Sequence, residues 1–152
     1  ISDVYVCIGT KSVESDIPIF GTDEEFKSTV VHEFIHPFIM HYCLKYRDQL
    51  EKYAALYKKN EDVYRRNGCP DWFSAMNELL TRTVEIRINS NGDEEKAAKA
   101  IEDQSKNLGF STIPVLYRAF DRYYSAIKRK ENNLDKVFPD IVQSLDESEK
   151  ND

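Results

Sequence analysis

The chain has 152 residues, of which 41% are hydrophobic and 12% aromatic, and its formal net charge is -6. This composition supports one globular domain with a buried core and excludes an intrinsically disordered chain. The acidic balance also argues against nucleic acid as a partner, because the only basic cluster is the tripeptide 128–130 and a phosphate backbone requires more positive charge.

The ends of the chain and its cysteines set further expectations. The first residue is Ile1, so we expect residues 1–152 to be a single domain at the C-terminal end of a longer protein. No apolar run approaches the roughly 20 residues that a bilayer requires, so we expect no membrane span in this segment. An extracytoplasmic location in a bacterium is the working expectation. Cys7, Cys43 and Cys69 are too widely spaced for a metal-binding pair, and we expect small buried residues, with one disulfide as the alternative.

The predicted elements begin with a small β portion and continue as helices. Residues 2–9 and 17–21 are rich in β-branched and aromatic side chains and predict short strands, with Pro18 at an edge or outside the ladder. Thr22 and Glu25 form a capping-box pattern that predicts the start of the first helix. Later helices are expected at about 45–65, 71–88, 93–108, 113–130 and 138–145, followed by a polar tail over 146–152. The sequence therefore predicts an α+β fold that is mainly α-helical, with about five to six helices.

The helix that begins after Thr22 is expected to bury a broad apolar face, because its apolar residues recur three and four apart. These residues are Phe26, Val30, Phe34 and Phe38, widened by Val31, Ile35 and Ile39. Pro37 lacks the N–H that would bond to the carbonyl of Glu33, so it predicts a kink. The kink either curves the helix around the core or adjusts the orientation of His36.

All three histidines lie in one stretch, "STVVHEFIHPFIMHY", residues 28–42. His32 and His36 are four residues apart, so on a helix their imidazoles lie side by side at a spacing that suits one tetrahedral Zn²⁺. Glu33 is rotated by about 100 degrees from His32, which places it to reach a water on the metal. Zinc lowers the pKa of such a water to about 7, so a carboxylate can take its proton and pass it to a leaving amine. The alternative is an amphipathic helix that carries two histidines by chance.

Two histidines alone make a weak site, so a third ligand is needed. His41 is nearest, but on a continuous helix it points about 180 degrees away from His32. The helix over 71–88 has an apolar stripe and, on a different side, a charged one. The apolar stripe is Trp72, Met76, Leu79, Leu80 and Ile86, and the other is Asp71, Ala75, Glu78, Arg82 and Glu85.

The charged stripe has two interpretations. It is either a solvated face with ion pairs between neighbouring turns, or the source of a glutamate ligand that completes a catalytic His₂Glu set. Glu78 and Glu85 lie about 10 Å apart along the helix axis, so only one of them can reach a zinc held by the first helix.

Three segments carry a resemblance to known proteins. "VVHEFIHPFI" (30–39) followed by "NELLTR" (77–82) resembles the zincin-type metallopeptidases whose third ligand is a glutamate on a later helix, the gluzincins. The chain is similar, more narrowly, to an uncharacterised bacterial family of HExxH zinc peptidases, with "KVFPDIV" (136–142) as a less distinct matching piece. The resemblance spans about 23–143.

The resemblance implies a zincin-like fold and a bound zinc ion. The implied site is His32, His36 and Glu78 as zinc ligands, with Glu33 as general base. Asn77, Arg82 and Glu85 are expected around these ligands, with Arg82 pairing with Glu78 or with Glu85.

The expected function is a zinc-dependent peptidase that attacks a peptide or protein substrate with a water activated by Glu33. A tyrosine or His41 would stabilise the oxyanion, and Tyr117, Tyr123 and Tyr124 are the candidates among nine tyrosines. Two alternatives stay open: a catalytically silent zincin-like binding module, and a helical protein without a metal.

Overall fold

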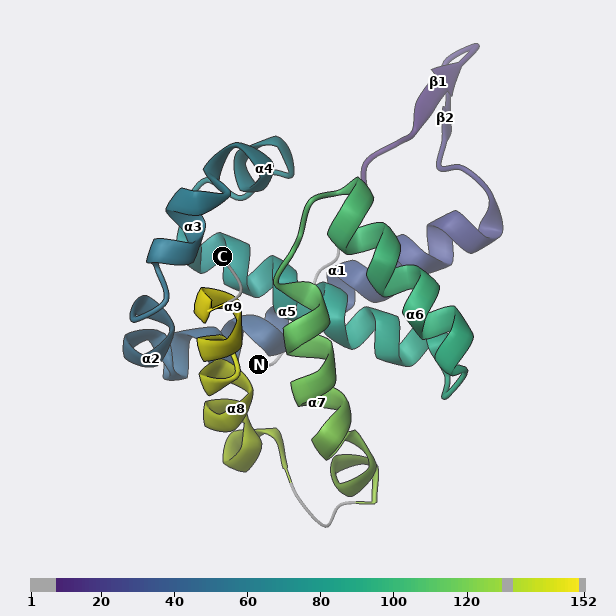
Figure 1. Ribbon diagram of the computed structural model, residues 1–152. Helices are drawn as coiled ribbons and strands as arrows, with labels where there is room; N and C mark the ends of the chain where they lie inside the picture. Colours follow the sequence, from purple (N-terminus) through teal and green to yellow (C-terminus); the bar gives the residue numbers. More distant parts are fainter. Residues whose placement is uncertain (1–7, 130–132, 151–152) are drawn as a thin grey trace.

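The computed structural model describes residues 8–129 and 133–150, which form a mainly helical α+β domain (Figure 1). The long elements are α1 (Asp23–Lys45), α5 (Trp72–Ser90), α6 (Glu94–Glu102), α7 (Ile113–Lys128) and α8 (Leu134–Gln143). The short elements are β1 (Ser12–Glu14), β2 (Ile17–Ile19), α2 (Arg47–Glu51), α3 (Ala55–Lys59), α4 (Glu61–Arg66), α9 (Asp146–Lys150) and the π-helical turn η1 (Asp103–Asn107). Within the described residues, none of these helices is both long and apolar enough to span a membrane.

The β portion is an antiparallel hairpin that projects from the helices (Figure 1). The strand predicted over 2–9 lies mostly outside the described residues, and residues 8 and 9 belong to no regular element. The strand predicted over 17–21 is confirmed as β2, but its partner is β1, which the sequence analysis missed. Ser15 and Asp16 have φ of 51 and 65 degrees, as a two-residue hairpin turn requires. This turn, rather than a hydrophobic run, explains why β1 is there.

Helix α1 begins with the predicted capping box, in which Thr22 N donates to Glu25 Oε2 at 2.8 Å and Glu25 N donates to Thr22 Oγ1 at 3.2 Å. The helix continues through Pro37. The prediction of its buried face was wrong in part. Its buried residues are Ile35, Ile39 and Cys43, whereas the exposed side includes Phe26, Phe34 and Phe38, at 40%, 49% and 47% exposed. Apolar residues surround almost the whole helix, so their spacing does not select one face.

The helix predicted over 45–65 is instead three short helices, α2, α3 and α4. No proline or glycine lies between them, so the sequence carries no breaker to mark the turns. Two hydrogen bonds connect this bent segment to the residues that follow it. Trp72 Nε1 donates to the carbonyl of Leu50 at 2.7 Å, and Tyr57 Oη donates to the carbonyl of Cys69 at 3.0 Å.

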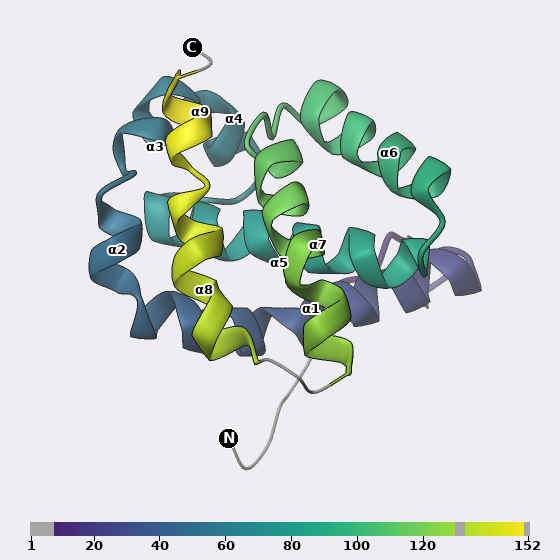
Figure 2. The same cartoon turned by 60° about the horizontal axis from the view of Figure 1, so that its bottom comes forward.

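Helix α5 forms the centre of the domain, packed against α1 on one side and against α6 and α7 on others (Figure 2). It starts at the Asp71 cap, whose side chain accepts from Ser74 N at 2.7 Å. The predicted apolar stripe is confirmed, since each of its five residues is buried. Cys43 and Cys69 are buried free thiols, so the disulfide alternative is excluded for this pair, while Cys7 lies outside the described residues.

The last predicted helix begins and ends earlier than expected, and a further short helix follows it. Helix α8 starts after the cap Asn133 instead of near Phe138, and it contains Pro139. Pro139 is tolerated because the carbonyl it leaves without an N–H, that of Asp135, accepts a hydrogen bond from Tyr46 Oη at 2.7 Å. The expected polar tail contains a further short helix, α9.

Candidate metal centre

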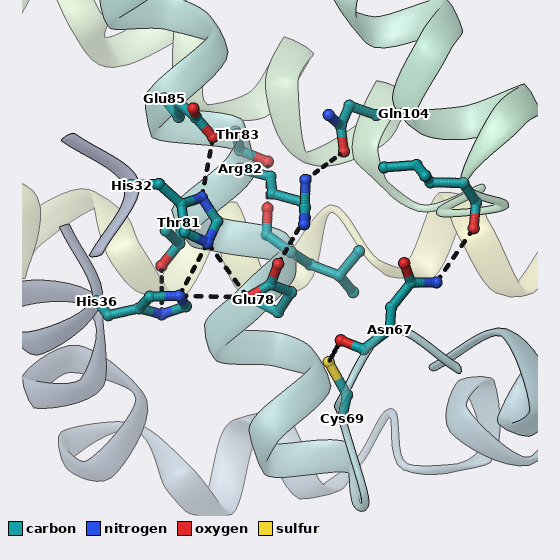
Figure 3. Close-up of polar contacts among 12 residues, drawn as sticks. His32, His36, Asn67, Cys69, Glu78, Thr81, Arg82, Thr83, Glu85 and Gln104 are labelled. Carbon is teal, nitrogen blue, oxygen red and sulfur yellow. Dashed lines mark hydrogen bonds and ion pairs between the residues drawn. The ribbon is translucent and has the colours of Figure 1, made fainter. Parts of the chain in front are cut away.

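Helices α1 and α5 cross so that three side chains converge (Figure 3). His32 and His36 come from consecutive turns of α1, and Glu78 comes from α5. The two histidine Nε2 atoms are 3.0 Å apart. Glu78 Oε2 lies 3.6 Å from His32 Nε2 and 3.3 Å from His36 Nε2. The structure therefore brings together the three residues that the resemblance implied as ligands.

These three atoms have the spacing that a single tetrahedral ion requires. Bonds of about 2.0–2.1 Å to a central zinc place ligand atoms about 3.4 Å from one another. The three side chains form a group that could hold a metal ion. Two imidazole nitrogens and one carboxylate oxygen are also the donor types that Zn²⁺ binds. The donor set thus fits a metal both in geometry and in chemistry.

The outward nitrogens of both imidazoles have hydrogen-bond partners on α5. His32 Nδ1 lies 3.0 Å from Glu85 Oε2, and Glu85 Oε1 accepts from Ser28 Oγ at 3.0 Å. His36 Nδ1 lies 3.1 Å from Thr81 Oγ1. The ionised Glu85 carboxylate can only accept, so it favours the His32 tautomer in which Nδ1 carries the proton and Nε2 is free to bind a metal. The Thr81 hydroxyl can accept from His36 Nδ1 in the same way.

The second carboxylate oxygen of Glu78, Oε1, is bound by Arg82 (Figure 3). Arg82 Nε donates to Glu78 Oε1 at 2.6 Å, and Arg82 Nη1 donates to Gln104 Oε1 at 3.0 Å. The guanidinium carbon lies 5.2 Å from the ring centre of Phe110, which is fully buried. The pairing of Arg82 with Glu78 was one of the two predicted alternatives. The solvated-face interpretation is wrong for Glu78, Arg82 and Glu85, which are 13%, 21% and 15% exposed.

The charges of the metal-free site are strongly coupled. Burial lowers the pKa of His32, but Glu78 and Glu85 outweigh it and raise the pKa to about 9. Burial raises the pKa of Glu78, but hydrogen bonds with His32 and His36 and the charge of Arg82 hold that pKa well below its usual range. A cation is therefore favoured at this position, and without a metal His32 supplies it by binding a proton.

Glu33 lies beside the ligands on α1. It is half-buried and lines an open pocket of about 290 Å³. The other lining residues are Ser28, Thr29, His32, Arg82 and Glu85. A carboxylate next to a ligand at an open pocket can exchange protons with a molecule bound there.

Comparison with known proteins places the chain in a family. The model of a family described as "Domain of unknown function (DUF4932)" matches residues 2–144. The chain belongs to this family. No curated protein and no solved structure matches it.

Three further residues were considered for the site: Asn77, His41 and Tyr123. Asn77 is next to Glu78 in the sequence and is buried, and its Oδ1 has no hydrogen-bond partner within the described part of the chain. His41 is exposed, with its ring against Tyr42. Tyr123 Oη donates to Asp140 Oδ2 at 2.9 Å, on the side of α7 that faces α8.

The sequence analysis missed Thr81, Ser28 and Gln104. Thr81 could have been found, since it follows Glu78 by three residues on the same helix and therefore faces α1 with it. Ser28 is one turn before His32 in the same way. Gln104 lies in a π-helical turn with no local sequence signal, so only the tertiary structure reveals its contact with Arg82.

Proposed function

We propose that this domain is a zinc-dependent peptidase with a zincin-like fold. His32, His36 and Glu78 would hold the Zn²⁺, and Glu33 would be the general base. The observation that best supports this is the triangle of ligand atoms with sides of 3.0, 3.3 and 3.6 Å. Three protein ligands also leave a fourth position open, as in catalytic zinc sites.

The protein groups have distinct roles in this proposal. A bound zinc ion lowers the pKa of a water molecule and polarises a carbonyl group. Glu33 takes a proton from the attacking water and later gives it to the nitrogen released when the C–N bond breaks. Glu85 and Thr81 orient the imidazoles, and Arg82 keeps Glu78 ionised and in place.

The surface next to the site supports a polypeptide as the substrate. The pocket beside Glu33 shares Ser28 and Thr29 with a hollow of about 440 Å³ next to the hairpin. It shares Glu85 with a hollow of about 110 Å³ beside α6. The shared lining residues make the three hollows neighbours, and a row of neighbouring hollows would suit an extended chain better than a compact molecule.

Metal content tests the site. Protein purified without a histidine tag is expected to contain about one zinc per chain by elemental analysis, and chelation should lower its melting temperature, because a ligand bound only by the folded state stabilises it. Metal-free protein that gains neither zinc nor stability on titration would exclude the site and leave a helical protein without a metal.

The base is tested by Glu33→Gln. The amide fills the same space but cannot take a proton, so hydrolysis of a peptide library should fall by about 10²–10⁴-fold while zinc stays bound. Glu24→Gln, an exposed change on the same helix, is the matched control and should alter neither property. If zinc-loaded wild type hydrolyses no peptide, the silent binding module becomes the better proposal.

A further inference from the structure

Arg82 is the permanent cation of the pocket beside Glu33. Of the six residues that line this pocket, Arg82 and His32 are the two that can be positively charged. His32 becomes neutral when Nε2 binds a metal. A guanidinium carries a fixed positive charge. Among the described residues that line this pocket, the proposed metal complex therefore leaves Arg82 as the one positive side chain.

The guanidinium is held in a fixed orientation by three contacts. Glu78 on α5 accepts from Nε, Gln104 on η1 accepts from Nη1, and the ring of Phe110 lies against its face. Its side chain is nevertheless 21% exposed, and Arg82 is one of the residues that line the pocket. A charged donor that is already oriented before the reaction can stabilise negative charge in the transition state without an energetic cost of reorganisation.

None of the tyrosines considered for the oxyanion is among the described residues that line the pocket. Tyr117 is buried, at 5% exposed. Tyr123 donates to Asp140, and the ring of Tyr124 lies 4.4 Å from the guanidinium carbon of Arg87. Among the described residues, Arg82 is thus the side-chain cation placed to meet negative charge at the pocket.

We propose that Arg82 is a catalytic residue that stabilises the oxyanion formed during peptide hydrolysis, an inference that rests on the function proposed above. As the water oxygen bonds to the carbonyl carbon, its proton goes to Glu33 and the π electron pair of the carbonyl moves onto oxygen. Arg82 stabilises the resulting oxyanion. The pair then re-forms the carbonyl as the C–N bond breaks, and the proton on Glu33 goes to the leaving nitrogen.

The experiment must separate stabilisation of the oxyanion from the positioning of Glu78 by its hydrogen bond with Arg82. Arg82→Gln and Arg82→Lys are compared with wild type for zinc affinity, for kcat and KM at saturating zinc, and for binding of a peptide in which a phosphinate replaces the scissile amide. The phosphinate resembles the oxyanion in shape and charge. We expect kcat of Arg82→Gln to fall by about 10²–10³-fold with little change in KM, and phosphinate affinity to fall in parallel. Arg82→Lys keeps the charge and should recover part of both losses.

Two controls make the outcome decisive. Affinity for the unmodified peptide, measured in the Glu33→Gln background, should not change with Arg82→Gln, because the ground state carries no oxyanion. Gln104→Leu removes one anchor of the guanidinium but leaves its charge, so it should cause a smaller loss than Arg82→Gln. If phosphinate affinity and kcat at saturating zinc stay at the wild-type level, Arg82 only positions Glu78 and the inference is wrong. Zinc-loaded wild type that hydrolyses nothing would instead overturn the proposed function, and the inference with it.

Discussion

Helices α1 and α5 supply the three ligand atoms, but they differ in how their sequences relate to their burial. On α5 the apolar stripe is buried, and Glu78 and Glu85 of the charged stripe face α1. On α1 the ligands face α5, while Phe34 and Phe38 on another side stay about half exposed. The comparison shows that a helix with two distinct faces determines its own orientation, whereas a helix that is apolar nearly all round is oriented by its partner. Here the partner of α1 is the helix that carries Glu78.

The largest effect is expected from removing the ligand on α5. Glu78→Ala removes one of three protein ligands and should weaken zinc binding by about 10³-fold or more. Glu85→Ala removes only the partner of His32 Nδ1, so its effect should stay within about 10- to 100-fold. Competition with a chelator of known affinity measures both.

A larger loss of zinc affinity from Glu85→Ala than from Glu78→Ala would change the proposed ligand set. If Glu85→Ala strips the metal and Glu78→Ala retains it, the triangle of His32, His36 and Glu78 is not the site, although a two-histidine zinc motif would survive.

Two neighbouring residues of α1 test the difference between its faces. Ile39 is 3% exposed, so Ile39→Ala should lower the free energy of unfolding by about 2–5 kcal/mol. Phe38 is 47% exposed, and Phe38→Ala should cost no more than about 1 kcal/mol despite the larger side chain. Urea titration of the metal-free protein measures both, and equal losses would mean that Phe38 is covered in solution.

The proximity of His32, His36 and Glu78 was predicted more closely than the fold around them. The spacing of His32 and His36 is a local property of one helix, so it could be interpreted without knowing any partner. The amphipathic pattern of α5 likewise identified its buried side. The burial of α1 and the bends between α2, α3 and α4 depend on contacts distant in sequence, such as the bond from Trp72 to Leu50, and no local pattern encodes them.

Two threonines on α5 test whether a hydroxyl group orients the His36 ligand. Both are fully buried, but Thr81 contacts His36 Nδ1 whereas Thr83 donates to the carbonyl of Leu79. Thr81→Val should weaken zinc binding by about 10-fold. Thr83→Val is the matched control, since it removes an equally buried hydroxyl and should leave zinc affinity unchanged. Isothermal titration distinguishes them, and equal affinities for the two variants would mean that Thr81 does not orient His36.

The smallest effect is expected at the exposed start of α1. Lys11 is the main partner that lowers the pKa of Glu25 to about 2, by donating to it at 2.7 Å, and Thr22 N adds to this. A lowered pKa contributes stability above the unfolded value of 4.5, and this contribution is lost as the pH falls toward 2. Glu25→Gln should therefore lower the melting temperature slightly at pH 7, and the difference should shrink at pH 3 and in high salt. A difference that grows on acidification would contradict the assignment.

Helices α2, α3 and α4 lie in the 41 residues between His36 and Glu78, and none of the three has a side-chain hydrogen bond capping its N-terminus. An ion that joins those two ligands would close this stretch into a loop, as a covalent cross-link does. Closing a loop of this length removes conformational entropy from the unfolded chain worth about 4 kcal/mol. The segment most sensitive to chelation would then be one that contributes no ligand, and its amide hydrogens should exchange faster once the ion is removed.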